Sequence, residues 1–209
     1  MLPRMLRKDE TNLFVKSLLK KYHVLGPLRK DSEFWFDEIR SAEQLTFQYV
    51  TTIFPPTQFF FLPTETLFSY EKGLITQNYE KSDRKQLILG IHPCDVHGIL
   101  VLDKYFLGTY EDPYYLRRRE NTIIVALTCQ EIGDRCFCES FGTGPDLKEG
   151  YDLLFTDLGD RYLVEVGSNA GKQIVQAANL AQATHDDLTE KDERMKRAKS
   201  KFKRKVNTE

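Results

Sequence analysis

The fold is decided by the stretch at residues 86–95, which reads QLILGIHPCD. Its apolar part, 86–91, predicts a buried strand, and residues 92–95 predict a tight turn. The apolar side chains that follow recur near one face of a helix, which predicts a helix over 96–106. A second apolar run, 121–127, predicts another buried strand. A strand, a helix and a strand in this order favour an α/β or α+β protein.

Outside residues 86–127, the sequence patterns that predict secondary structure are weaker. Residues 11–25 carry an apolar stripe opposite several lysines, which predicts an amphipathic helix ended by Gly26-Pro27. Residues 30–70 are rich in aromatic side chains and interrupted by prolines, which favours short strands and packed loops. Residues 153–166 predict a hairpin across Gly159-Asp160, because a two-residue turn needs the positive φ that glycine tolerates. We therefore expect a mixed sheet with flanking helices and a late β-hairpin.

The C-terminal part of the chain differs from the rest in charge. Between Arg194 and Lys205 there are eight basic residues and no acidic one. Apolar residues recur there at helical spacing, which predicts a basic amphipathic helix over 188–206. This helix either docks one stripe on its own domain or leads onward as a linker; the alternative is a membrane-surface or RNA-binding helix. We expect an α/β cysteine-cluster domain over 1–170 and a helical extension or linker over 171–209.

The composition argues against several classes of protein. The 209 residues contain 30 Lys and Arg against 31 Asp and Glu, a net charge of -1, which argues against a dedicated nucleic-acid binder. The sequence has no run of about 18 uncharged apolar residues that could span a membrane. Its N-terminus lacks the apolar region of a secretory signal. We therefore expect a cytoplasmic protein, in which thiols stay free, bind a metal or do redox work.

The four cysteines fall at positions that the expected fold would bring together. Cys94 lies in the turn after the first strand, and Cys129 follows the end of the second. Cys136 and Cys138 come in the next loop. If the two strands are parallel neighbours, their carboxyl ends lie side by side, so that Cys94 and Cys129 meet at one edge and the loop curls back over them. This placement argues for one site made from all four thiols.

Four thiolates can hold either a structural zinc ion or an iron–sulfur cluster. The spacing here is C-x6-C-x-C, whereas structural zinc usually has C-x2-4-C pairs. The spacing therefore favours a cubane cluster, with zinc or unligated thiols as the alternatives. His92 and His97 flank Cys94 and are expected to pack or to form hydrogen bonds, and Asp95 is expected to cap the following helix. The nearby Gly133, Gly142 and Gly144 would let backbone amides approach sulfur.

Several short motifs occur in an order that marks a resemblance. They are Ile91-His-Pro-Cys-Asp95, Leu102-Asp-Lys-Tyr-Phe106, Asp112-Pro-Tyr-Tyr115, Arg117-Arg118, Leu127-Thr-Cys129, Cys136-Phe-Cys138, Gly142-Thr-Gly-Pro145 and Tyr151-Asp-Leu153. From about Leu13 to Lys172 the chain resembles the N-terminal domain of the 4Fe-4S dicluster proteins. That family is related to one of the subunits of anaerobic sulfite reductase and to the beta subunit of cytoplasmic sulfhydrogenases.

The resemblance implies an iron–sulfur electron-transfer subunit, or a fragment of one, in an anaerobic multisubunit oxidoreductase. Given this resemblance, the expected cofactor is one [4Fe-4S] cluster on Cys94, Cys129, Cys136 and Cys138. The implied partners are a flavin and NAD(P)-type electron-transfer subunit and a hydrogenase or sulfite reductase catalytic subunit. Single electrons would pass between them through this chain.

The sequence departs from the family in one respect. Family members continue into a ferredoxin-like domain with two C-x2-C-x2-C-x3-C-P runs, and this sequence contains no such run. We therefore expect either a truncated form or a stand-alone version, and an electron-transfer subunit more than an enzyme by itself. The alternative function is a non-redox interaction or assembly domain with a structural zinc or an unligated cysteine site.

Overall fold

The computed structural model describes residues 2–77 and 84–208 and has a mixed α/β architecture. Its centre is an eight-stranded sheet in the order β10-β1-β9-β8-β7-β6-β2-β3. From one edge to the other the strands are β10 (Ala181–Gln182), β1 (Arg4–Arg7), β9 (Arg161–Val166), β8 (Leu153–Asp157), β7 (Thr122–Leu127), β6 (Gln86–Ile91), β2 (His23–Lys30) and β3 (Glu33–Glu38). The prediction of a mixed sheet with flanking helices is confirmed.

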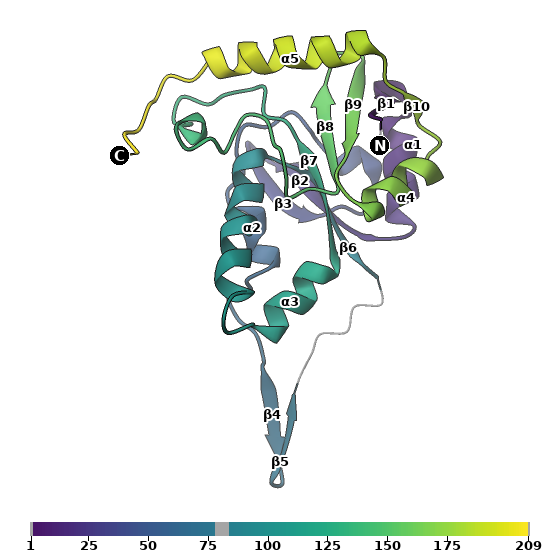
Figure 1. Cartoon of the computed structure of the whole chain (residues 1–209). Helices are drawn as coiled ribbons and strands as arrows, with labels where there is room; N and C mark the ends of the chain where they lie inside the picture. The colour runs from purple at the N-terminus through teal and green to yellow at the C-terminus, as the bar shows by residue number, and fades with distance from the viewer. Residues whose placement is uncertain (1, 78–83, 209) are drawn as a thin grey trace.

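Helices cover both faces of this sheet (Figure 1). On one face lie α1 (Thr11–Leu19) and α4 (Asn169–Ala177), which bury residues such as Phe14 and Ile174 in one core. On the other lie α2 (Pro93–Phe106) and α3 (Pro113–Glu120), which bury residues such as Ile99 and Tyr115 in a second core. The short 3-10 helices are η1 (Lys8–Glu10), η2 (Ala42–Gln44), η3 (Pro56–Phe59) and η4 (Cys138–Phe141).

The middle of the sheet is parallel, which meets the condition for Cys94 and Cys129 to lie at one edge. β6 pairs in parallel with β2 and β7, and β7 pairs in parallel with β8. All six residues of β7 are buried, and so are the last five of β6. The carboxyl ends of these strands therefore meet at one edge of the sheet. This arrangement decides where the residues that follow each strand are placed.

The prediction of a helix over 11–25 is wrong in its second half. The helix α1 ends at Leu19, and Gly26-Pro27 lies inside β2. A methyl group on Gly26 would lie 3.3 Å from the carbonyl oxygen of Leu89 in β6 and 2.7 Å from Leu45, so glycine permits the close approach of the backbones. Pro27 lies beyond the three residues of β2 that pair with β6, where its missing N–H removes no bond of that ladder.

The late hairpin and the C-terminal helix both form. β8 and β9 are antiparallel across Gly159, whose φ is 99°. The helix α5 (His185–Ser200) begins at Thr184 with a capping box and buries Met195 on its apolar side. It lies across the end of the β8–β9 hairpin (Figure 1). The predicted continuation to residue 206 is wrong, since α5 ends at Ser200 and the chain leaves in an extended form.

The aromatic-rich segment forms short strands and loops, as predicted. Within it, Phe60 is fully buried, whereas Phe61 is 56% exposed and stacks on Phe106. The hairpin of β4 (Phe68–Glu71) and β5 (Leu74–Gln77) forms a separate two-stranded sheet that projects from the body (Figure 1). Over the described residues, no helix combines the length and the apolar character needed to cross a membrane.

Candidate metal centre

Two of the four cysteines lie where neighbouring parallel strands end. β6 ends at Ile91, and Cys94 is the second residue of α2. The helix thus begins at Pro93, three residues earlier than predicted, because proline suits a first helical position, where an N–H has no partner in the helix. Cys129 comes two residues after the end of β7. Since β6 and β7 pair in parallel, both cysteines lie at the same edge of the sheet.

The other two cysteines lie in the segment 129–145, which we call the cysteine loop. The Cys136 N–H donates to the Gly133 carbonyl at 3.0 Å, and Cys138 begins the short helix η4. The loop closes on itself, because the Cys129 N–H donates to the Pro145 carbonyl at 3.0 Å. The structure thus returns this loop to the strand end from which it started.

The four thiols are free and lie close enough to influence one another's charge. Burial, followed by the negative charges of Cys136 and Cys138, raises the pKa of Cys129 to about 12. Cys94 is open to solvent on one side, but the protein around it, and after it the charges of Asp95, Cys138 and Cys129, raise its pKa above the usual range. Burial, followed by the charge of Cys136, also raises the pKa of Cys138.

These electrostatics have a chemical consequence. Several thiolates placed together repel one another, and this repulsion adds to burial in raising the pKa of Cys94, Cys129 and Cys138. A bound cation reverses this effect, because a coordinated thiol is deprotonated outright. The donor set therefore suits a positively charged group and gives little support to nucleophilic cysteine chemistry, which needs a lowered thiol pKa.

Backbone amides approach two of the sulfurs, as expected for thiolate ligands. The Asp95 N–H donates to the His92 carbonyl at 3.1 Å, and it also lowers the pKa of the Cys94 thiol against the larger effect of burial. The N–H groups of Cys138 and Glu139 act in the same way on Cys138. Cys94 also lies in the first turn of α2, where the helix dipole favours negative charge.

Glycines at the expected positions lie near two sulfurs. A methyl group on Gly144 would lie only 2.9 Å from the Cys138 Sγ, and one on Gly133 would lie 3.5 Å from the Cys136 Sγ. Gly142 is different, because its added methyl would have no neighbour within 4 Å and its φ is 65°. Gly144 thus permits the backbone to lie against sulfur. Gly133 instead leaves room for Val50, whose Cγ1 would lie 2.8 Å from an added methyl, and Gly142 permits the turn after η4.

The spacing of the donors bears on the kind of metal group. Within residues 2–77 and 84–208, no three His, Cys, Asp or Glu side chains are gathered in a way that could hold a metal ion. Thiolates around one tetrahedral zinc ion must lie within about 3.8 Å of one another, because each Zn–S bond is about 2.3 Å. A four-iron cluster accepts ligands that are farther apart, since each thiolate binds a different iron. The arrangement of donors in the described residues therefore gives no support to a single zinc ion.

Beside the cysteines, an aromatic contact fixes the turn between β6 and α2. The His92 ring stacks on the Tyr49 ring with centroids 4.1 Å apart and planes at 4°. The Tyr49 hydroxyl donates to the Gly90 carbonyl at 2.7 Å. Burial lowers the pKa of His92 to about 4, so the ring is neutral at neutral pH. His92 packs, as expected; Tyr49 was not predicted, because no local pattern marks a residue that meets the turn from 43 positions away.

The expected helix cap by Asp95 is wrong. The cap position is His92, and no side chain bonds the free amides there. Asp95 lies one turn too far along the chain, inside α2, where burial raises the pKa of its carboxyl to about 6. A cavity of about 540 Å³ adjoins this region and is lined by Tyr49, His92 and Thr128 among others.

The arginine run that follows α2 serves internal contacts. Arg118 donates to the Phe60 carbonyl at 2.8 Å and pairs with Glu65. Arg119 pairs with Asp103 at 3.0 Å. These two arginines fasten α3 to neighbouring segments, so they are not available to an anionic ligand.

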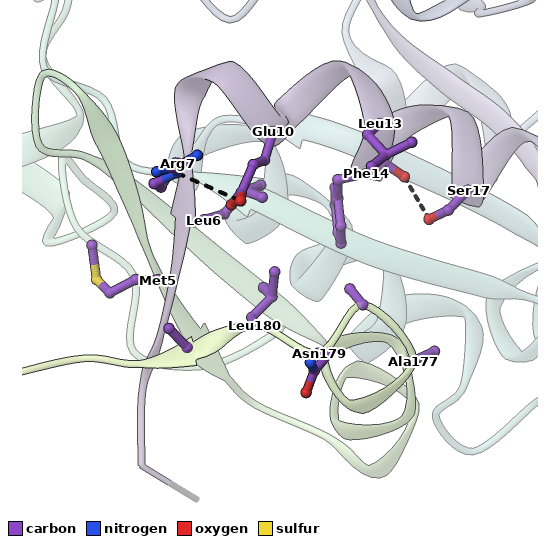
Figure 2. A pocket seen from close by; sticks show the side chains of 12 residues that line it. Met5, Leu6, Arg7, Glu10, Leu13, Phe14, Ser17, Ala177, Asn179 and Leu180 are labelled. Atoms are coloured by element: carbon purple, nitrogen blue, oxygen red, sulfur yellow. Dashed lines mark hydrogen bonds and ion pairs between the residues drawn. The ribbon is translucent and has the colours of Figure 1, made fainter.

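A second cavity lies on the face of the sheet that α1 and α4 cover. It has a volume of about 690 Å³ and lies between α1 and the end of α4, where Leu13, Phe14 and Leu180 line it (Figure 2). Arg7 and Glu10 at its rim pair with each other at 3.5 Å. No cysteine lines this cavity, so it is separate from the cysteine site.

The fold and the site define a class: a mixed α/β domain that carries four free thiols at the carboxyl edge of its parallel strands. The chain is similar to Sulfhydrogenase 2 subunit beta of Pyrococcus furiosus, with 39% identity over 202 residues. The match covers 94% of this chain and 58% of the length of the relative. No family model matches the chain, and no solved structure does. The expected relation to sulfhydrogenase beta subunits is thus supported, and the dicluster family is not confirmed by a family model.

Proposed function

We propose that this chain is the electron-transfer domain of a hydrogenase-type oxidoreductase complex. In this proposal Cys94, Cys129, Cys136 and Cys138 hold one [4Fe-4S] cluster. The observation that carries it is the placement of the free thiols: Cys94 and Cys129 follow neighbouring parallel strands, and Cys136 and Cys138 lie in the loop that returns to the same strand end. The similarity to a sulfhydrogenase beta subunit supports the same class of complex.

The residues around the thiols fit the role of cluster ligands. A bound [4Fe-4S] cluster would supply the ability to accept and release one electron. The amides near Cys94 and Cys138 offset part of the negative charge of the thiolates. Gly144 lets the loop backbone lie against the Cys138 sulfur, where N–H donors raise the potential of a cluster. The exposure of Cys94 gives the site a side that an electron partner can approach.

The proposal includes the partners of the chain. Electrons would pass between a flavin and NAD(P)-type subunit and a hydrogenase or sulfite reductase catalytic subunit, in the cytoplasm and without nucleic acid. The relative is named as one subunit of a sulfhydrogenase, which supports assembly with other subunits.

The test is anaerobic purification followed by iron and sulfide analysis and by electron paramagnetic resonance after reduction. We expect about four irons and four sulfides for each chain and a signal from a reduced cluster. Cys94→Ser and Cys138→Ser should lower the iron content, whereas substitution of His97 should not. A colourless protein with one zinc for each chain would refute the cluster.

A second function is favoured by one observation, namely that no three donor side chains among the described residues are gathered in a way that could hold a metal ion. Under this alternative the chain is a non-redox interaction or assembly domain, and the observation favours unligated cysteines over the structural zinc that the sequence also allowed. Cys94→Ser would then leave a partner complex with its full electron flux. A loss of flux in an assembled complex would support the electron-transfer function instead.

A further inference from the structure

The C-terminal segment, residues 201–206, lies against the cysteine loop. After α5 ends, the chain turns down beside this loop (Figure 1). The Lys201 ammonium donates to the Gln130 carbonyl at 2.9 Å. The Lys203 ammonium donates to the Asp134 carboxylate at 2.6 Å. Two lysines of the segment thus bind the first half of the loop.

Further contacts extend this attachment to the second half of the loop. Lys201 also lies 3.7 Å from the Glu131 carboxylate, and the Val206 N–H donates to the Ser140 hydroxyl at 3.1 Å. In the described chain, residues 131–141 bond outside the cysteine loop to Lys201, Lys203 and Val206. At the start of the loop the Gln130 side chain donates to the Asp157 carbonyl at 2.8 Å, so the C-terminal segment supplies the polar attachment of the distal part of the loop.

The segment has a fixed end because α5 is anchored to the sheet. Lys191 pairs with Glu165 of β9 at 2.5 Å and with Asp146, just after the loop, at 3.3 Å. Met195 and Ala198 are buried on the same helix. The attachment of the loop is therefore made to the core of the domain and not to a loose tail.

The charges of the segment suit an anionic site. The cysteine loop carries Glu131, Asp134 and Glu139 against one basic residue, Arg135, and the negative charge of Glu131 acts on Cys129. The ammonium groups of Lys201 and Lys203 lie on two of these carboxylates. Neutralising these two carboxylates lowers the electrostatic repulsion between them and the negative charges of four thiolates.

We infer that Lys201 and Lys203 are positioning residues, which hold the cysteine loop so that Cys136 and Cys138 face the strand-end cysteines. The role in cluster binding rests on the proposed function; the holding of the loop does not. Neither lysine touches a sulfur atom, so both act through the loop backbone and its carboxylates.

The test compares two double variants of the full chain. K201Q/K203Q removes both attachments, and K199Q/K205Q removes the same charge from lysines whose side chains make no recorded hydrogen bond or ion pair in the described chain. We expect amide hydrogen exchange in residues 131–141 to become about threefold to tenfold faster in the first variant only. In about 1 M salt, where charges are screened beyond about 3 Å, the difference in exchange rate between the two variants should become smaller.

Exchange at the parental rate in K201Q/K203Q, or equal acceleration in both variants, would overturn the inference. A second measurement uses protein purified anaerobically, in which a chelator should remove iron about threefold faster from the first variant than from the control. If the parent chain holds no iron, the proposed function fails, and hydrogen exchange still decides whether the segment holds the loop. The two failures are therefore distinguishable.

Discussion

The two halves of the cysteine site are built in different ways. Cys94 and Cys129 follow β6 and β7, whose residues are almost entirely buried. Cys136 and Cys138 lie in a loop with exposed aromatic residues, and that loop is held by its own backbone and by the C-terminal segment. One half of the site is thus as rigid as the core, whereas the other depends on a few polar contacts. The predictions below separate these halves.

The largest effect is expected in the core beneath the strand-end cysteines. Ile91 is fully buried at the end of β6, three residues before Cys94. Ile91→Ala should lower the free energy of unfolding by about 2–5 kcal/mol, because it removes buried methyl groups and leaves a cavity. Chemical denaturation followed by circular dichroism measures this change.

The matched control in the loop is Phe141, which is 54% exposed and contacts Phe137. Phe141→Ala should change the free energy of unfolding by less than about 1 kcal/mol. Equal losses in the two variants would contradict the division of the site into a core half and a loop half.

Two glycines of the loop test whether the backbone must lie against sulfur. Gly144→Ala places a methyl group 2.9 Å from the Cys138 Sγ and should displace that thiol. Gly142→Ala meets no atom within 4 Å but has a φ of 65°, so it should cost about 1 kcal/mol of stability. We expect Gly144→Ala to lose iron in anaerobic preparations and Gly142→Ala to keep it. Loss of iron in both would point to unfolding of the loop instead.

A smaller effect is expected where α5 is anchored. Asp187 is buried and accepts hydrogen bonds from Thr184 and Arg161. Burial raises the pKa of Asp187, but the hydrogen bonds from Thr184 and Arg161 outweigh it and lower the pKa below its usual range. A lowered pKa in the folded state means that the carboxylate stabilises the fold above the unfolded pKa of about 3.9, and that this stability is lost as the pH falls further.

Asp187→Asn should therefore lower the free energy of unfolding by about 1 kcal/mol at neutral pH. The difference from the parent chain should vanish as the pH falls through the range in which Asp187 is protonated. Denaturation curves at several pH values measure it. Persistence of the same difference at the acidic end of the series would show that the carboxylate charge is not its cause.

Much of the parallel centre was predictable from local sequence. The run 86–91 forms β6 with the predicted bounds, because a fully apolar run flanked by a turn has few ways to bury itself except as a central strand. The hairpin around Gly159 was predictable for a similar reason, since its turn needs a residue with positive φ. The juxtaposition of Cys94 and Cys129 then follows from the parallel pairing of β6 and β7.

Other features depend on contacts between distant segments. Gly26-Pro27 reads as a helix stop, yet it lies in β2, because a close approach to β6 and the antiparallel partner β3 override local preference. The stacking of Tyr49 on His92 joins segments more than forty residues apart, and no periodicity encodes it.

The sequence by itself determined the class of fold, the two central strands and the cysteine set, because buried strands and their order follow from local apolar patterns. Only the tertiary structure decided how the cysteine loop is held. Lys201 and Lys203 read as part of a solvated basic helix, and their partners Gln130 and Asp134 lie about seventy residues away. The contact forms because α5 is anchored across the β8–β9 hairpin and ends beside the loop, a geometry that charge and spacing along the chain do not contain.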